Sequence, residues 1–181
     1  MDYIEYTVKV WSNGDKFWYL NGKLHREDGP AIEYEDGYDA WYLNGNLHRV
    51  DGPACEYTDG SKSWYLNGNL HRVDGPAIEY ANESKFWYRN GKLHREDGPA
   101  VEDADGGKSW WQHNKLHRED GPAIEYSNGD KSWYLDGIYM TEAEHAAATK
   151  PVKELTVAEI EALLGYSVKV VKLPVDLTTN W

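Results

Sequence analysis

The chain has 181 residues and is rich in large aromatic side chains with a polar edge, with nine Trp and fourteen Tyr against two Phe and two Met. Its formal net charge of −12 opposes direct binding to nucleic acid or to an anionic membrane, and it favours a partner with a basic surface. The single cysteine, Cys55, excludes an internal disulfide framework, and no apolar run approaches the roughly 20 residues of a membrane span, so we expect a soluble, cytoplasmic protein.

A repeat of 23 residues runs through most of the chain. Tryptophan marks the repeat at Trp18, Trp41, Trp64, Trp87, Trp110 and Trp133. A Gly-Pro pair keeps the same step, and its glycines are Gly29, Gly52, Gly75, Gly98 and Gly121. A period held without slippage over roughly 115 residues is typical of a repeat protein in which neighbouring units bury each other's faces.

In chain order, each repeat contains short strands joined by tight turns. Residues 30–34 (PAIEY) and 40–43 (AWYL) have the β-branched and aromatic composition of strands, and an Asp-Gly turn separates them. Asn44 and Gly45 then form a second turn, because both residue types adopt positive φ readily. The pattern predicts a mainly β protein built as an elongated array of antiparallel β-hairpin repeats.

Alternation along these strands assigns residues to faces. Ile32 and Tyr34 share one side, and Trp41 and Leu43 share a side. We expect these residues to form one apolar face that is copied in every repeat. Cys55 stands 23 residues after Ile32, so we interpret it as a core residue and not as a nucleophile.

Two short helices are predicted after the last repeat. Thr141 with Glu144, and Thr156 with Glu159, have the spacing of a capping box at the start of a helix. Gly165 is a normal stop signal for the second helix.

A last strand is expected over residues 166–173, followed by a loose tail. We therefore divide the chain into a repeat array, residues 1–139, and a small helix-helix-strand cap, residues 140–181. Such an end unit would shield the last edge of the array.

The 23-residue period and the order Y-x-DG-x-x-x-W-Y-x-NGK-L-H resemble the MORN repeat in a divergent form, over residues 11–139. The chain departs from that pattern because it carries Arg-x-Asp-Gly-Pro where MORN units usually have Gly soon after the His. The resemblance implies a β-hairpin array used as an interaction surface. It also implies phospholipid binding, against which the net charge argues.

The C-terminal segment is similar to the ends of small accessory proteins of tailed bacteriophages. This similarity implies a protein that acts in the bacterial host cytoplasm, where it engages or blocks a host factor such as a component of a defence system.

The His-Arg-x-Asp element is the obvious candidate for metal or acid–base chemistry. It occurs at His25 and Asp28, His48 and Asp51, His71 and Asp74, His94 and Asp97, and His117 and Asp120. Equivalent residues of neighbouring repeats lie two strands apart, about 10 Å, whereas the ligands of one metal ion converge to about 2.0–2.3 Å. We interpret the element as structural, with Asp in the turn and paired to the neighbouring Arg. No metal and no cofactor are expected.

More informative are the positions where the repeat breaks its own pattern. Arg89 replaces a leucine, Asp103 replaces a tyrosine, and Trp111, Gln112 and His113 replace Tyr-Leu-Asn, in a turn that also lacks its glycine. A repeat that departs from its consensus locally often does so to fit a ligand or partner. Drift in a damaged repeat is the alternative. We predict that these five residues belong to a binding surface.

For function, the leading hypothesis is a non-enzymatic protein-interaction module that binds and blocks a basic host protein through an acidic, aromatic-rich β face. The chain has no glycine-rich phosphate loop, no nucleophile elbow and no Cys/His metal spacing, and its carboxylates stand at repeat positions. One alternative is a small-ligand sponge that stacks a nucleotide on Trp, Tyr and Arg. Another is a self-assembling scaffold, a homo-oligomer formed through open strand edges.

Overall fold

The computed structural model describes residues 5–151, 155–165 and 167. Contacts divide the chain into two compact units, Met1–Thr149 and Lys150–Trp181. The first unit contains the repeats and helix α1 (Glu142–Ala148), and the second contains helix α2 (Val157–Leu164).

One antiparallel sheet of fourteen strands runs through all the repeats, and each internal repeat adds two strands to it. The strands are β1 (Thr7–Val10), β2 (Lys16–Leu20), β3 (Lys23–Leu24), β4 (Ile32–Glu33), β5 (Asp39–Ala40), β8 (Cys55–Glu56), β9 (Lys62–Ser63), β12 (Ile78–Glu79), β13 (Lys85–Phe86), β16 (Val101–Glu102), β17 (Lys108–Ser109), β20 (Ile124–Glu125), β21 (Lys131–Leu135) and β22 (Ile138–Met140). The predicted array of antiparallel hairpins is thus confirmed.

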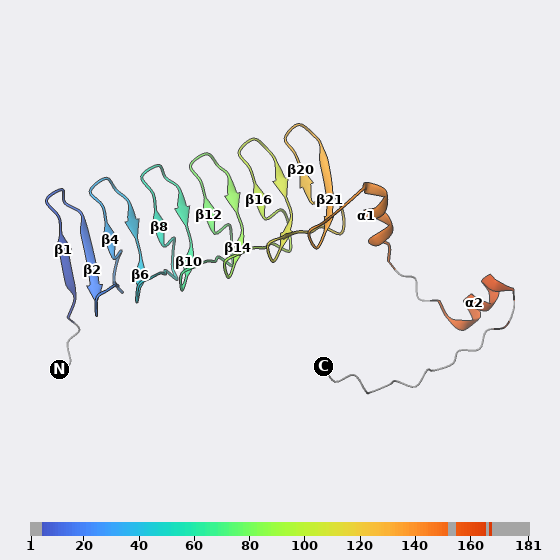
Figure 1. Cartoon of the computed structure of the whole chain (residues 1–181), viewed down its shortest axis with the longest axis horizontal. Coiled ribbons are helices and arrows are strands. Elements are labelled where there is room, and N and C mark those ends of the chain that lie inside the picture. The colour runs from blue at the N-terminus through green and yellow to red at the C-terminus, as the bar shows by residue number, and fades with distance from the viewer. Residues whose placement is uncertain (1–4, 152–154, 166, 168–181) are drawn as a thin grey trace, which may run out of the picture. The chain divides into compact units, whose positions relative to one another are not determined.

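Four internal repeats also carry a separate two-stranded hairpin. These hairpins pair β6 (Tyr42–Leu43) with β7 (Asn46–Leu47), β10 (Tyr65–Leu66) with β11 (Asn69–Leu70), β14 (Tyr88–Arg89) with β15 (Lys92–Leu93), and β18 (Trp111–Gln112) with β19 (Lys115–Leu116). In Figure 1 the small hairpins follow one edge of the array, and the turns of the central sheet follow the other.

The tight turns form as their residue types predict. Asn44 and Gly45 have φ of 52° and 85°, the left-handed values of a two-residue hairpin loop between β6 and β7. In the fifth repeat, His113 and Asn114 keep this backbone at φ of 51° and 66° without a glycine. The hairpin is preserved there, although the backbone of two non-glycine residues has a conformation that L-residues rarely adopt.

The core contains small side chains from every internal repeat. Fully buried alanines stand at Ala31, Ala40, Ala54, Ala77, Ala100 and Ala123. The buried cluster near the N-terminal end consists of Ile32, Ala40 and Cys55, with Tyr42 among the partly buried residues around it. Cys55 is 1% exposed, which confirms the core position predicted for it. Burial also raises the pKa of its thiol.

The predicted composition of the apolar face is wrong. Tyr42 packs against the core cluster, while Trp41 and Leu43 lie on the other side, and Tyr34 is 38% exposed. Alternation states which residues share a side, but it does not state which side is buried. The Trp41 ring is instead covered by the guanidinium of Arg49, so it does not need a place in the core.

Both predicted helix starts are confirmed. Thr141 with Glu144, and Thr156 with Glu159, form complete capping boxes, and Gly165 ends α2 with φ of 74°. Helix α1 contacts β21 and β22, so it covers the end of the array within the first unit.

The strand predicted over residues 166–173 lies outside the described residues, apart from residue 167. Among residues 5–151, 155–165 and 167, no helix combines the length and apolar character needed to cross a membrane.

Candidate binding surface

Each of the first five repeats has an arginine stacked on its tryptophan. The pairs, with distances from guanidinium carbon to ring centroid, are Arg26 on Trp18 (4.2 Å), Arg49 on Trp41 (3.9 Å), Arg72 on Trp64 (4.0 Å), Arg95 on Trp87 (4.1 Å) and Arg118 on Trp110 (3.9 Å). At these distances each guanidinium interacts with the negative face of the ring.

The same arginines are also fixed by carboxylates. Nε of Arg49 donates to Asp51 (3.0 Å), and Nη1 donates to Glu56 (3.0 Å) and to the carbonyl of Pro53 (3.1 Å). The predicted pairing of the arginine with the Asp two residues on is thus confirmed. The Glu and Trp partners, which come from either side of the turn, were not predicted from the sequence.

This stack explains the glycine of the Gly-Pro pair. A Cβ built on Gly52 would lie 2.9 Å from the guanidinium carbon of Arg49, closer than real Cβ contacts allow. The other four repeats show the same approach, at 2.8–3.0 Å. A side chain at this position would push the arginine off its ring and away from its carboxylates.

The repeated histidine ties its repeat to the next at four of the five joints. Nδ1 of His48 lies 3.2 Å from the backbone nitrogen of Asn67 and 2.9 Å from its Oδ1, so either tautomer finds a partner. The same clasp joins His25 to Asn44, His71 to Asn90, and His117 to Asp136. Within the described part of the chain, no three His, Cys, Asp or Glu side chains gather as a metal site would require.

Grooves lie between neighbouring repeats on the side of the stacked arginines. Four of them are formed by described residues, and each contains a tryptophan and the residue two positions after it. They are groove 1 (Trp41, Leu43; 620 Å³), groove 2 (Trp64, Leu66; 610 Å³), groove 3 (Trp87, Arg89; 650 Å³) and groove 4 (Trp110, Gln112; 530 Å³). The walls of each groove are the Arg-x-Asp segments of the two repeats that flank it.

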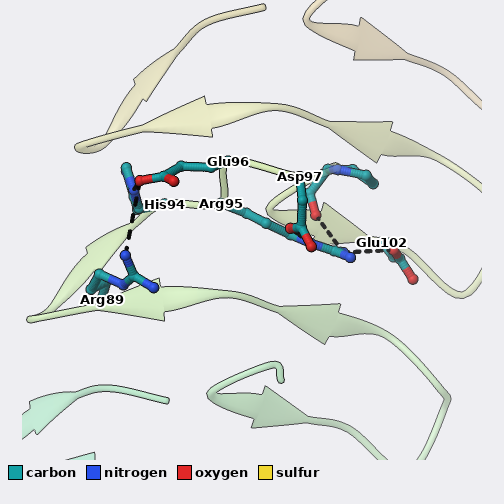
Figure 2. A network of polar contacts seen from close by, with 7 residues as sticks. Arg89, His94, Arg95, Glu96, Asp97 and Glu102 are labelled. Atoms are coloured by element: carbon teal, nitrogen blue, oxygen red, sulfur yellow. Dashed lines mark hydrogen bonds and ion pairs between the residues drawn. The ribbon is translucent and has the colours of Figure 1, made fainter. Parts of the chain in front are cut away.

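Two of the predicted binding residues line neighbouring grooves. Arg89 is in groove 3, where its Nη1 lies 3.9 Å from Oε1 of Glu96, and Nε2 of His94 lies 3.4 Å from the same oxygen (Figure 2). Gln112 is in groove 4, and Glu96 lines both grooves. The departures from the repeat at Arg89 and Gln112 therefore replace leucine by polar groups on one continuous surface.

His113 breaks the clasp between the fourth and fifth repeats. Its ring stacks on that of His94, with centroids 4.5 Å apart and an interplanar angle of 28°. The buried Nδ1 of His94 has no hydrogen-bond partner, unlike the equivalent nitrogen of its neighbours. Asn114 replaces part of the lost connection, since its Oδ1 accepts the backbone N–H of Leu93 (2.6 Å).

The other two predicted residues lie apart from the grooves. Trp111 is half-buried, and its indole N–H donates to Oγ of Ser109 (2.7 Å). Asp103 stands in the turn between β16 and β17, where partial burial and the charge of Asp105 raise its pKa. The structure therefore brings Arg89 and Gln112 onto one surface, places His113 at the joint between two repeats, and separates Trp111 and Asp103 from them.

An apolar strip that was not predicted from the sequence lies on the same surface. Val50 and Val73 are 84% and 73% exposed. Val50 lines grooves 1 and 2, beside Leu43 and Leu66, and Val73 lines grooves 2 and 3. The signal was present in the sequence, because the other three repeats carry a glutamate at the position of these valines. Those glutamates are Glu27, Glu96 and Glu119.

A row of aspartates borders all the grooves. Their side chains are 82–86% exposed, at Asp28, Asp51, Asp74, Asp97 and Asp120. The hydrogen bond that each accepts from its arginine lowers the pKa of every one of these carboxyls. The row therefore remains ionised at neutral pH. Because each arginine pairs with one aspartate and one glutamate, each set of these three side chains has one negative charge in excess.

Comparison of the chain with models of known protein families gave no match, and comparison with curated proteins gave none either. The class of protein is thus defined by the fold and its surface, a β-hairpin repeat protein with an acidic face divided by grooves.

Proposed function

We propose that this protein is a non-enzymatic interaction module that binds a basic protein through its grooved face. The observation that carries the proposal is the row of five ionised aspartates along that face. Each aspartate bonds its arginine through Oδ1 and remains largely exposed. Each arginine is shared with a glutamate, so every repeat leaves one negative charge in excess. A linear array of such charges attracts a complementary surface over a Debye length and raises the rate of association.

Blocking is the effect that we propose for such binding. Basic surfaces of proteins commonly bind nucleic acid, and an acidic face that covers one would compete with that ligand. A bacterial host protein, for example one of a defence system, is the partner that the similarity to phage proteins suggests.

Stacking of a nucleotide on the tryptophans is less favoured. One face of each groove tryptophan already carries the chain's own arginine, and the arginine donors are directed to carboxylates. A phosphate would also meet the aspartate row.

Self-association is a second candidate with an observation of its own. All four residues of the edge strand β1 are exposed, and Trp11, which follows it, is 60% exposed. An open strand edge can pair with another copy. Measurement of mass against concentration would test this candidate, since pairing through β1 predicts mass that rises with concentration.

The interaction proposal is tested by affinity capture from bacterial lysate at low and at about 0.5 M salt, read by mass spectrometry. Two charge variants sharpen the test. Glu27→Gln with Glu96→Gln and Glu119→Gln removes three charges from the grooved face. Asp36→Asn with Asp59→Asn and Asp105→Asn removes three charges from the turns at the other edge, where the chain itself carries Asn at equivalent positions such as Asn82.

We expect wild type to capture a basic protein at low salt and to lose it at high salt. The groove-face variant should capture several-fold less, while the turn variant should match wild type. Capture that resists salt, or that both variants reduce equally, would contradict a specific role for the grooved face.

A further inference from the structure

The four grooves share a framework but differ in what lines them. Groove 2 is lined by Val50, Leu66 and Val73, and groove 1 by Leu43 and Val50 with Glu27 on its other wall. Val50 and Val73 are the two groove-lining valines exposed by 73% or more, and they stand in consecutive repeats. Such a pair leaves apolar surface in water that a ligand could cover.

The spacing of the grooves follows from the sheet. Each internal repeat adds two strands, so neighbouring grooves lie about 9.6 Å apart at about 4.8 Å per strand. A ligand that fills both apolar grooves must therefore project two apolar side chains in one direction at this distance.

Polyproline II geometry fits this spacing best. It has three residues per turn and a rise of about 3.1 Å, so residues i and i+3 share a side about 9.3 Å apart. In a β-strand, residues that share a side are about 6.7 Å apart, and in an α-helix the nearest match is i and i+7, at about 10.5 Å.

The borders of these grooves select the charge of the ligand. Asp28 and Asp51 line groove 1, and Asp51 and Asp74 line groove 2. Carboxylates beside an apolar strip favour a ligand that carries Lys or Arg next to its apolar residues.

We infer that grooves 1 and 2 bind a basic peptide segment in the polyproline II conformation, with one apolar side chain in each groove. The inference rests on the proposed function, and it names the part of the partner that docks. Grooves 3 and 4 are outside this site, because Arg89 and Gln112 stand there in place of the leucine that lines grooves 1 and 2.

The test uses the full chain and two peptides of identical composition. The peptide KPLPPLPPK places its leucines three positions apart, and KPLLPPPPK places them side by side. Binding is measured by isothermal titration and by the NMR signals of the Trp indoles. We expect the first peptide to bind about tenfold more tightly than the second.

A double variant separates apolar docking from charge attraction. Val50→Glu with Val73→Glu introduces the residue that three other repeats carry at this position, so the fold tolerates it. Charge alone predicts tighter binding of a basic peptide to this more acidic variant. We expect binding to weaken about tenfold or more instead. Asn82→Asp with Asn128→Asp adds the same charge at the turns, where Asp occurs in other repeats, and should leave affinity unchanged or slightly higher.

Three outcomes would overturn the inference. These are equal affinity for the two peptides, tighter binding by the Val50/Val73 variant, and no binding by wild type up to about 1 mM. A stronger preference for an Ala-rich helical peptide with leucines seven positions apart would also overturn it. If captured partners depend on the groove-face glutamates but not on the valines, the proposed function stands and this inference fails.

Discussion

The second and third repeats share the stacked arginine with the fourth and fifth, but the two pairs differ in the residues that line their grooves. In both pairs an arginine stacks on a tryptophan, as Arg72 does on Trp64 and Arg95 on Trp87. The second pair nevertheless presents Arg89 and Gln112 to its grooves, where the first presents leucine. Residues whose contacts lie within the repeat are thus kept, and those that face the groove vary, which separates structural positions from positions free to determine binding.

The largest expected effect tests whether the two frameworks are equally strong. Trp64→Ala and Trp87→Ala should each lower the free energy of unfolding by about 3 kcal/mol, because both remove a large ring and the arginine stack on it. Urea denaturation measures the change. Trp11→Ala, at an exposed ring without a stacked arginine, is the control and should cost less than about 1 kcal/mol. If only one of the two substitutions lowered the free energy of unfolding, the two pairs of repeats would differ in the strength of this stack.

The glycine beside the stack provides a more specific test. A Cβ at Gly75 or Gly98 would lie 2.9 or 3.0 Å from the guanidinium carbon of Arg72 or Arg95. Gly75→Ala and Gly98→Ala should each lower the free energy of unfolding by about 1–2 kcal/mol. In an Arg72→Ala background the cost of Gly75→Ala should nearly vanish, because the clash has been removed. If Gly75→Ala lowered the free energy of unfolding equally in the Arg72→Ala background, the loss would come from the backbone and not from a clash with the arginine.

Repair of the irregular turn should make the joint between the fourth and fifth repeats resemble the others. His113→Asn with Asn114→Gly restores the partner for Nδ1 of His94 and relieves the left-handed backbone at residue 114. The free energy of unfolding should rise by about 1 kcal/mol. Thermal and urea unfolding measure the gain, and Asn90→His in a regular turn is the converse control. No gain would mean that the stacked histidines replace the clasp fully.

The smallest expected effect is on the pKa of the exposed aspartates, which both pairs of repeats carry. The pKa of Asp51 and of Asp97 is lowered mainly by the hydrogen bond from the neighbouring arginine, Arg49 or Arg95. Both should titrate below the usual range near 3.9 by NMR. A carboxyl whose pKa is lower in the folded state contributes stability that is present above the unfolded pKa and is lost as the pH falls through the folded pKa.

The matched variant for this titration is Arg49→Ala. It should raise the pKa of Asp51 toward the usual range while leaving that of Asp97 unchanged. A low pKa of Asp51 that survives in this variant would assign the shift to backbone hydrogen bonds.

The sequence predicted the hairpins and the helix caps because their causes are local. Asn44 and Gly45 specify a turn by themselves, and Thr141 and Glu144 specify a capping box. The stack of Arg49 on its tryptophan depends on how the chain folds back on itself, and the repeat period alone does not predict that fold. For the same reason the tryptophans were assigned to the core, when arginine covers them on the grooved side.

The candidate surface was predicted less completely than the fold. Departures from consensus located Arg89 and Gln112, which line neighbouring grooves. They also selected Asp103 and Trp111, because a comparison along the sequence does not state which edge or side a position occupies. Val50 and Val73 were overlooked because two adjacent repeats share them, so neither looked exceptional.

The missing clasp between the fourth and fifth repeats has a mechanical consequence. An array of repeats holds together through interfaces between nearest neighbours, so tension along it is carried by every joint in series. The joint where His94 lacks its partner is the one at which a stretched array would open first. If a partner pulled on the grooved face, the array would therefore separate at this joint, with four repeats on one side and the helix-capped end on the other.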